Sequence, residues 1–274
     1  MHVSALLLLF CAYGLVHALT VPGTSPWPEK HLRPASKLAK RAVSNELAPR
    51  ALCPLVWWTI ATELKLSFLG IGGCNNLARQ AIRAAFHDCF VDGCNGSLML
   101  SGECERSENN GLEDICTQLP KVRAKYGVGM ADLIQFAGAV AVEVCPLGPA
   151  MPFFAGREDS TTASAQGQLP SVTGSGDQLL NMFKAKGFTA TDLAALIGAH
   201  TTSKQFFVDK TKVGAAQDTT PNVWDVAYYG QTLAGTAPFT FESDKNLAAQ
   251  TEVKKPFKSF VGNQLGWNGA FVVA

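Results

Sequence analysis

Apolar residues recur at helical spacing along most of the chain after residue 53, and this periodicity limits the possible folds more than any other feature. It predicts helices over residues 53–70, 75–88, 110–127 and 130–144. We expect an interruption of the third helix at Pro120, because proline removes a backbone donor. The fourth, "MADLIQFAGAVAVEV", is the most apolar and is predicted to be buried. The fold class is therefore mainly α.

The second half of the chain continues this pattern after a long loop. Residues 146–176 are rich in Gly, Pro, Ser and Thr and predict an irregular connection. Helices are then expected over 176–187 and 189–200, the latter with Thr189 as its N-cap, followed by shorter segments near 222–231 and 243–261. A chain of this length forms one domain, or two lobes around one core.

The N-terminus has the features of a leader. Residues 4–16 form an apolar run of signal-peptide length, and the small residues that follow predict cleavage after Ala18. Residues 19–41 hold four prolines and five basic residues and end in the dibasic pair Lys40-Arg41, so they are interpreted as a propeptide or a flexible leader. The mature domain would span 42–274, and the protein is predicted to be secreted and extracellular.

Charge and hydropathy exclude two classes of partner. Residues 42–274 carry 18 Lys and Arg (23 less 5 in the leader) against 21 Asp and Glu (22 less 1), a net charge of −3. Nucleic acid is therefore not expected as a partner. The leader is too short to span a bilayer and no later segment is long and apolar enough, so no membrane association is expected.

Seven of the eight cysteines lie after the leader, and in an oxidising compartment they predict disulfides. Cys89 and Cys94 flank a short turn and could close a small loop. A metal site with that spacing would need more nearby ligands than one histidine. An odd count leaves one thiol unpaired, and the sequence does not assign it.

Only His87 and His200 remain available for histidine chemistry once the leader is removed. In "RAAFHDCF", Arg83 and His87 are four residues apart and project from one helical face, whereas Asp88 points about 100° away. The alternative is a buried histidine bonded to backbone beside a surface arginine. His200 follows the small pair "GA" at the end of its helix. One histidine at a helix end facing another backed by arginine suits an axial ligand and a catalytic base, as in a haem site.

At these residues the sequence resembles the secreted haem peroxidases of plants and fungi. "IRAAFHDCFVDGCNGSLML" is similar to the distal segment of that family and "LAALIGAHTTSKQFFVD" to the proximal segment, and the likeness covers nearly all of 51–274. "NNGLEDI" and "GRED" are closest to the fungal group, while "HDCFVDGC" is nearer the plant version. The resemblance implies haem b between a distal lobe, about 51–155, and a proximal lobe, about 156–274.

The resemblance also implies roles for single residues. His200 would be the axial ligand of the iron and Asp244 its hydrogen-bonding carboxylate. His87 would be the distal base and Arg83 the distal arginine. Three further residues would support this pocket: Phe86 at the haem face, Asn109 bonded to His87, and Glu103 behind Asn109.

Two calcium ions and two disulfides follow from the same likeness. The first ion would be bound by oxygen atoms of Asp88, Val91, Gly93, Asn95 and Ser97, with asparagine where the family has aspartate. The second would be bound by Thr201, Asp218, Thr220, Val223 and Asp225. Cys74–Cys145 and Cys89–Cys94 match family disulfides, whereas Cys53, Cys104 and Cys116 do not map cleanly.

The function implied is hydrogen peroxide-dependent, one-electron oxidation of small aromatic donors by a monomer. The alternative is a secreted haem- and calcium-binding protein of the same fold with little turnover. Relatives that oxidise manganese use three carboxylates, and the matching positions here are Asn76, Gln80 and Phe206. The surface tryptophan of lignin-oxidising relatives corresponds to Ala195. Core packing is the expected role of Trp57, Trp58, Trp224 and Trp267.

Overall fold

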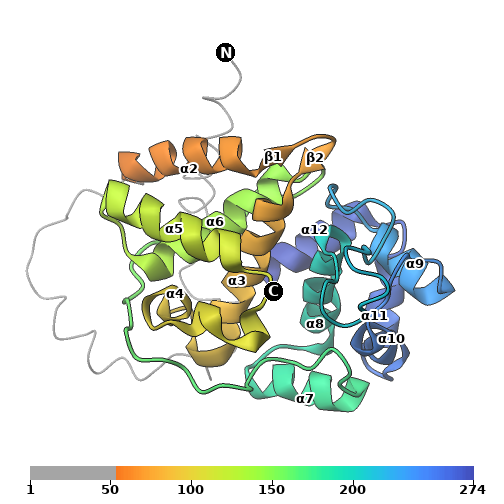
Figure 1. Cartoon of the computed structure of the whole chain (residues 1–274). Coiled ribbons are helices and arrows are strands. Elements are labelled where there is room, and N and C mark those ends of the chain that lie inside the picture. The colour runs from red at the N-terminus through yellow and green to blue at the C-terminus, as the bar shows by residue number, and fades with distance from the viewer. Residues whose placement is uncertain (1–53) are drawn as a thin grey trace, which may run out of the picture.

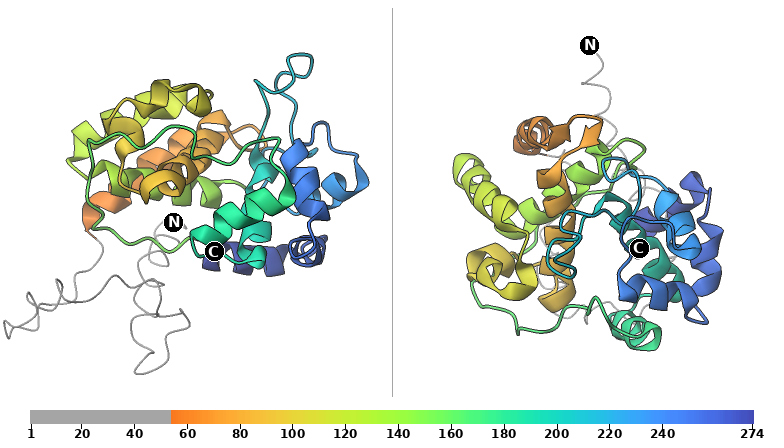
Figure 2. Two further views of the ribbon diagram at one scale, coloured as in Figure 1. Left: turned by 90° about the horizontal axis from the view of Figure 1, so that it is seen from below. Right: turned by 45° about the vertical axis from the view of Figure 1, so that its right-hand side comes forward.

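The computed structural model describes residues 54–274, and the predictions for the signal peptide, the propeptide and Cys53 lie outside this range. Helices α2 to α6 form an N-terminal group, and helices α7 to α12 form a C-terminal group beside it (Figures 1 and 2). The N-terminal group comprises α2 (Leu55–Phe68), α3 (Asn76–Asp92), α4 (Ser97–Leu100), α5 (Glu113–Tyr126) and α6 (Met130–Val144). The C-terminal group comprises α7 (Gly176–Ala185), α8 (Ala190–Ile197), α9 (Ala227–Ala234), α10 (Glu242–Ala249), α11 (Lys254–Ser259) and α12 (Gln264–Val273).

Short elements connect these helices. Strands β1 (Leu69–Gly70) and β2 (Gly73–Cys74) pair antiparallel, with Leu69 opposite Cys74 and Gly70 opposite Gly73. The 3-10 helices are η3 (Glu103–Glu105), η4 (Ser107–Asn109) and η5 (Gly198–Thr202). Residues 145–175 form the long irregular connection that the sequence predicts. The mainly α prediction is confirmed.

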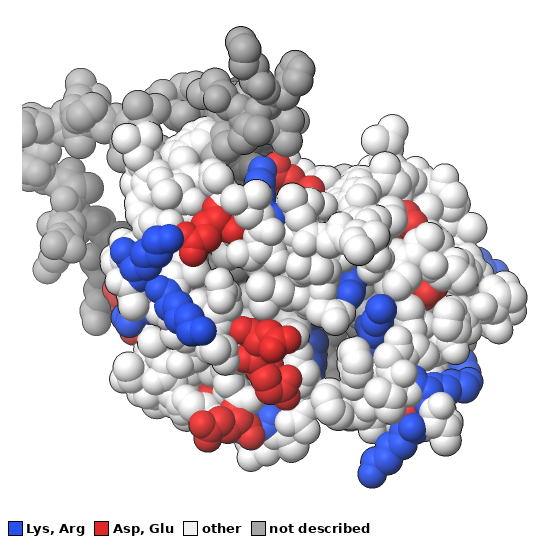
Figure 3. All heavy atoms as spheres, turned by 45° about the horizontal axis from the view of Figure 1, so that its top comes forward, with Lys and Arg blue, Asp and Glu red and all other residues white. Residues whose placement is uncertain are grey.

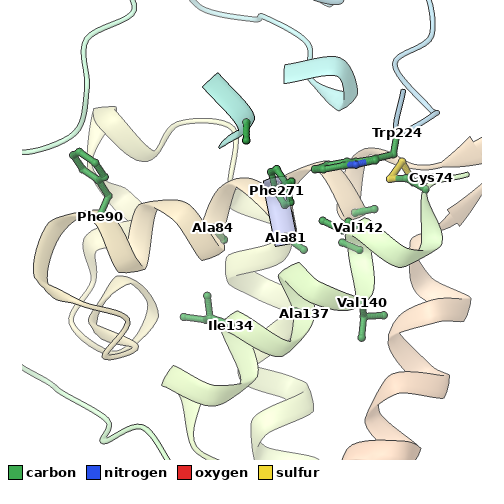
Figure 4. Packing of buried hydrophobic residues seen from close by; sticks show 14 of the residues in the cluster. Cys74, Ala81, Ala84, Phe90, Ile134, Ala137, Val140, Val142, Trp224 and Phe271 are labelled. Atoms are coloured by element: carbon green, nitrogen blue, oxygen red, sulfur yellow. A yellow bond between two sulfur atoms is a disulfide. The ribbon is translucent and has the colours of Figure 1, made fainter. Parts of the chain in front are cut away.

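The core of the N-terminal group lies where α3 packs on α6. Ala81 and Ala84 of α3 face Ile134 and Ala137 of α6, and all four side chains are fully buried (Figure 4). Alanine at three of these four positions allows the two backbones to approach closely. Helix α3, which carries the histidine and arginine of interest, is therefore fixed along its inner face.

Three helices differ from what the sequence predicts. Helix α5 runs through Pro120 without a break, so the expected interruption is wrong. Leu119 and Val122 are buried on either side of this proline, and their packing outweighs one lost backbone hydrogen bond. Helix α3 extends to Asp92 and ends at Gly93, whose φ of 91° suits a left-handed cap. Helix α12 was not predicted at all.

Three disulfides link described residues. Cys74–Cys145 joins β2 to the end of α6, and Cys89–Cys94 closes the turn after α3, so both pairings implied by the family resemblance are present. A third, Cys104–Cys116, joins η3 to α5. This leaves Cys53 as the unassigned cysteine of the predicted mature chain.

The two helical groups are tied together near β2 and the start of α3. The backbone N–H of Cys74 donates to the carbonyl of Asn222 at 3.0 Å. The guanidinium of Arg79 donates to the carbonyl of Pro221 and to Oδ1 of Asn222, both at 3.0 Å. Gly73 packs directly under this segment, since a methyl group on it would come within 2.0 Å of the Asn222 carbonyl oxygen. We call this set of contacts the Arg79 junction.

No single helix within residues 54–274 is long and apolar enough to cross a membrane. Helices α5 and α6 reach that length and apolarity only as a pair, and the pair is bent by 116°. On the face shown in Figure 3, Lys, Arg, Asp and Glu form small groups of both signs on a mostly uncharged surface.

Candidate active site

Helix α3 holds Arg83 and His87 in direct contact. Nε of Arg83 donates to Nε2 of His87 at 3.1 Å. The two terminal nitrogens of the same guanidinium donate to the carbonyls of Asn110, at 2.7 Å, and Glu108, at 3.1 Å. These carbonyls lie around η4 and fix the arginine from the side opposite the helix. The pairing expected from the spacing of four residues is therefore present.

The other ring nitrogen of His87 is held by Asn109. Nδ1 of His87 lies 2.6 Å from Oδ1 of Asn109. Because an amide oxygen only accepts, Nδ1 carries the proton and Nε2 keeps its lone pair. Asn109 in turn donates to the backbone carbonyl of Glu103 at 2.8 Å. The Glu103 carboxylate instead accepts from the Ser101 hydroxyl and the Ser164 N–H, so it supports the loop rather than the asparagine.

Burial lowers the pKa of His87 to about 3, and the positive charge of Arg83 acts in the same direction. The hydrogen bond to Asn109 opposes them by favouring the protonated ring. His87 is therefore neutral at ordinary pH, with an acceptor nitrogen pointed at a fixed guanidinium. When a bound molecule replaces the N–H of Arg83 at this nitrogen, Nε2 can take a proton from that molecule.

Helix α8 delivers His200 at its C-terminal end. The helix begins in a capping box, in which Oγ1 of Thr189 accepts from the N–H of Asp192 at 3.2 Å and the Asp192 carboxylate accepts from the N–H of Thr189 at 2.8 Å. The chain then tightens into η5, which contains His200. The predicted cap is confirmed.

Gly198 lets the end of α8 sit against two large aromatic side chains. A methyl group at Gly198 would come within 2.2 Å of the Tyr229 hydroxyl and 2.5 Å of Nε1 of Trp267. The same two groups donate to carbonyls of α8, Tyr229 to Ala194 at 2.8 Å and Trp267 to Ala195 at 2.9 Å. The small residue before the histidine therefore fixes the height at which His200 emerges.

A buried carboxylate orients His200. Nδ1 of the ring lies 3.0 Å from Oδ1 of Asp244, in the first turn of α10, and the Asp244 side chain is fully buried. The other carboxylate oxygen, Oδ2, has no hydrogen-bond partner of standard geometry among the described residues. Burial raises the pKa of the neighbouring Tyr228 well above its ordinary value, and the charge of Asp244 raises it further.

Segments from the two helical groups meet beside Arg83. Gly111 is packed close to both of them, since a methyl group on it would come within 3.2 Å of the Phe207 ring and 3.3 Å of the Arg83 guanidinium. Phe207 belongs to the loop that follows His200, so this loop reaches the arginine of α3. Phe86 is half-buried on the same helix and stacks toward Phe183 of α7 with 6.1 Å between ring centroids. Side chains of both groups of helices therefore meet around Arg83 and Phe86.

The residues predicted for the first calcium ion lie in the last turn of α3 and in the loop and short helix that follow it. Asp88 accepts from the N–H groups of Gly96, at 3.0 Å, and Leu98, at 3.3 Å. Oδ1 of Asn95 accepts from the N–H of Ser97 at 3.0 Å. Burial raises the pKa of Asp88 to about 6. Val91 and Gly93 lie within the same turn, which the Cys89–Cys94 disulfide closes.

The second predicted calcium set is also gathered. The Thr201 hydroxyl donates to Oδ2 of Asp218, and the N–H of Thr220 donates to Oδ1 at 2.8 Å. Burial raises the pKa of Asp218 to about 6, and the nearby charge of Asp225 contributes. Val223 follows in the same turn, with its N–H bonded to the Thr220 carbonyl at 2.9 Å. Two neighbouring carboxylates at least partly withdrawn from solvent would bind a cation favourably.

Within residues 54–274, no cluster of three or more His, Cys, Asp and Glu side chains is arranged to hold a metal ion. Any cation at these two places would depend on hydroxyl, amide and backbone oxygens beside one or two carboxylates. This donor set suits calcium, which accepts such neutral oxygens, better than a transition metal.

A search of protein families matches residues 70–263 to the model described as Peroxidase. The chain belongs to the peroxidase family. This peroxidase is 32% identical over 261 residues to "Ligninase LG5" of Phanerodontia chrysosporium, covering 82% of this chain and 70% of the relative. It is 30% identical to "Low-redox potential peroxidase" of Taiwanofungus camphoratus, over 78% of this chain and 70% of that one. A third relative is "Manganese peroxidase 3" of Phlebia radiata, which is 29% identical over a stretch that covers 74% of this chain and 66% of the relative.

These matches make the protein a haem peroxidase of the plant and fungal superfamily, of the fungal type. The residues present fit the haem. The His200 side chain is 31% exposed although Asp244 behind it is fully buried. Because Nδ1 of His200 is hydrogen-bonded to Asp244, only Nε2 of this ring is available as an iron ligand in the peroxidase.

The positions that correspond to special sites of other peroxidases are occupied by side chains with other partners. Asn76 accepts from Arg79, and Gln80 bridges the Asp114 carboxylate and the N–H of Ile115. Phe206 is 42% exposed. Ala195 is fully buried, as are Trp224 and Trp267, while Trp57 is 5% exposed and Trp58 is half-buried.

Sequence reasoning missed three contributors to the site. The carbonyls of Glu108 and Asn110, which fix Arg83, carry no side-chain signal. The Cys104–Cys116 disulfide, which braces the segment from η3 to α5 around Asn109, was left unassigned. Tyr228, whose ring contacts that of His200, was not singled out, because nothing in the sequence around it indicates this contact.

Proposed function

We propose that this peroxidase reduces hydrogen peroxide at haem b and oxidises small phenolic donors in one-electron steps. The proposal depends on the arrangement around His87. Its neutral imidazole donates the Nδ1 proton in a hydrogen bond to Asn109, and its Nε2 accepts a hydrogen bond from Arg83. A base held in one tautomer beside a fixed positive charge is what cleavage of the O–O bond requires.

His200 would hold the haem through Nε2, and Asp244 would make that nitrogen more electron-donating by accepting the Nδ1 proton in a hydrogen bond. When bound, the haem supplies the two electrons that peroxide takes up. His87 would take the proton from the peroxide oxygen nearer the iron and return it to the departing oxygen. Arg83 would stabilise the negative charge that develops on that departing oxygen.

Two calcium ions are part of the proposal, at the Asp88 and Asp218 sites. The first site lies one residue after His87, and the second begins one residue after His200. Each ion would neutralise a buried carboxylate and so stabilise the backbone that carries a histidine. The second site has two carboxylates and the first has one, so we assign the higher affinity to the second.

The donors we propose are small aromatic molecules that reach the haem edge directly, along the loop around Pro170. Asn76, Gln80 and Phe206 supply no negative charge for Mn(II), and Ala195 offers no ring that could pass an electron from the surface. The protein would act as a secreted monomer outside the cell, in keeping with its disulfides and its predicted leader.

The proposal is tested with the purified holoprotein in two assays. A Soret band that shifts on addition of peroxide and returns when a simple phenol is added is the expected result. Saturable, peroxide-dependent oxidation of Mn(II) at the rate of phenol oxidation would contradict the donor assignment. A Soret band that does not respond to peroxide would contradict the proposed chemistry as a whole.

A further inference from the structure

Tyr228, at the start of α9, lies next to the histidine that we assign to the iron. Its ring meets the His200 ring edge-on, with 6.0 Å between centroids and 88° between planes. The tyrosine is fully buried, so no outside molecule reaches it. An oxidisable ring is therefore fixed within the proximal side of the pocket, in a place that the proposed peroxide chemistry does not use.

The hydroxyl of Tyr228 and Oδ2 of Asp244 are both buried and both lack a hydrogen-bond partner of standard geometry in the described part of the chain. The Asp244 carboxylate is also the charged group that acts most strongly on this hydroxyl. Asp244 uses its other oxygen, Oδ1, for His200. The phenol therefore lies close enough to the Asp244 carboxylate for its charge to act on the hydroxyl, and Oδ2 of that carboxylate has a free lone pair that can accept a proton.

We propose that Tyr228 is an internal one-electron donor to the haem pocket. After peroxide has been reduced and no outside donor is present, Tyr228 gives one electron to the haem, and its hydroxyl proton moves to Oδ2 of Asp244. The O–H bond breaks and a neutral tyrosyl radical remains. An outside phenol at the haem edge later returns the electron by way of the haem, without touching Tyr228, and Asp244 returns the proton.

The neighbouring rings are less suited to hold the radical, although they continue from Tyr228 into the core. Tyr229, Trp267 and Trp224 follow with 5.3, 5.8 and 4.8 Å between successive centroids. The Tyr229 hydroxyl and the Trp267 indole N–H donate to backbone carbonyls, and Nε1 of Trp224 has no partner of standard geometry. None of these rings has a base that accepts its proton, so oxidation would leave a positive charge in an apolar interior, which is costly.

This inference rests on the proposed peroxide chemistry, because that chemistry supplies the oxidant. The experiment uses the holoprotein mixed with a small excess of hydrogen peroxide without any donor, frozen within seconds and examined by electron paramagnetic resonance. Protein labelled with ring-deuterated tyrosine identifies the residue type. The test variant is Tyr228→Phe, which removes only the hydroxyl. The matched control is Tyr229→Phe, an equally buried neighbour whose hydroxyl faces a carbonyl.

We expect an organic radical signal in the wild type that narrows on deuteration of tyrosine, persists in Tyr229→Phe and falls at least tenfold in Tyr228→Phe. A wild type whose Soret band responds to peroxide but which shows no such signal would overturn the inference alone. An equal signal in Tyr228→Phe would also overturn it. A Soret band that does not respond to peroxide would instead count against the proposed function. Thermal unfolding of both variants shows whether either has lost its fold.

Discussion

Nδ1 of His200 and Oδ1 of Asp244 lie 3.0 Å apart, and this contact joins the end of α8 to the first turn of α10. His200→Ala removes the protein ligand that we assign to the iron, so haem content and Soret absorbance should fall sharply. Asp244→Asn keeps an acceptor oxygen but removes the charge, so haem should stay bound while affinity or activity falls about 10- to 100-fold. Haem extraction and absorbance measure both. Full haem retention in His200→Ala would refute the axial role.

His87→Ala should leave haem bound and slow the reaction with peroxide by about a hundredfold or more, the usual loss when a positioned base is removed. Stopped-flow absorbance at the Soret band measures the rate. Asn109→Ala is a milder change, because it keeps the base and removes the group that fixes its tautomer. A rate for His87→Ala near that of the wild type would exclude His87 as the base.

The pKa of His87 predicts the dependence on pH. Because the folded pKa is about 3, below its ordinary value of 6.5, the imidazole stays neutral and the reaction with peroxide should be independent of pH from 8 down to about 4. The stability that this group contributes is fully present above pH 6.5 and is lost as pH falls toward 3, because the unfolded chain then binds the proton more readily. A half-maximal rate near pH 6.5 would show that the imidazole is solvated.

Removal of calcium should destabilise the protein, because Asp88 and Asp218 then remain buried without a cation. The Asp88 ion should leave first, since its site has only one carboxylate, and the reaction with peroxide should weaken before haem is lost. Titration calorimetry of the chelated protein measures both affinities, and Asp218→Asn should abolish only the tighter one. Two equal affinities would mean that Asn95 is compensated by other oxygens.

Gly198→Ala tests the packing at the end of α8. The added methyl group would meet the Tyr229 hydroxyl and Trp267, and overpacking of this kind costs about 1–3 kcal/mol. Gly269→Ala is the matched control, since a methyl group there meets nothing within 4 Å and alanine favours a helix by up to about 1 kcal/mol. Thermal unfolding should therefore move in opposite directions in the two variants. Equal shifts would show that α8 adjusts freely.

Features set by local sequence were predictable. Three such features depend only on neighbours in the chain and are present in the structure. They are the Thr189 cap, the burial of the most apolar helix, and the contact between Arg83 and His87. Pro120 was misjudged because the packing of Leu119 and Val122, which no local rule contains, decides whether α5 continues. Helix α12 was missed because Gly266 and Gly269 weaken its pattern, while Trp267 and Phe271 bury it.

The candidate site also contains features that the sequence predicts and features that it does not. Arg83, His87 and His200 could be named because they fall in two short segments that resemble a family. The support of Asn109 could not, because it comes from the carbonyl of Glu103 rather than from its carboxylate, and backbone groups are the same in every sequence. The partner of Cys104 was equally hidden, since twelve residues and a turn separate it from Cys116.

The Arg79 junction has a consequence for the way the protein unfolds. Arg79 belongs to α3, but its partners are Pro221 and Asn222, which lie in the chain between Asp218 and Asp225 of the proposed second calcium site. Neither helical group can melt without breaking these hydrogen bonds to the other group. We therefore expect the molecule to unfold as one cooperative unit, in which heat, denaturant or proteolysis that opens the Asp218 turn also releases the helix that carries His87.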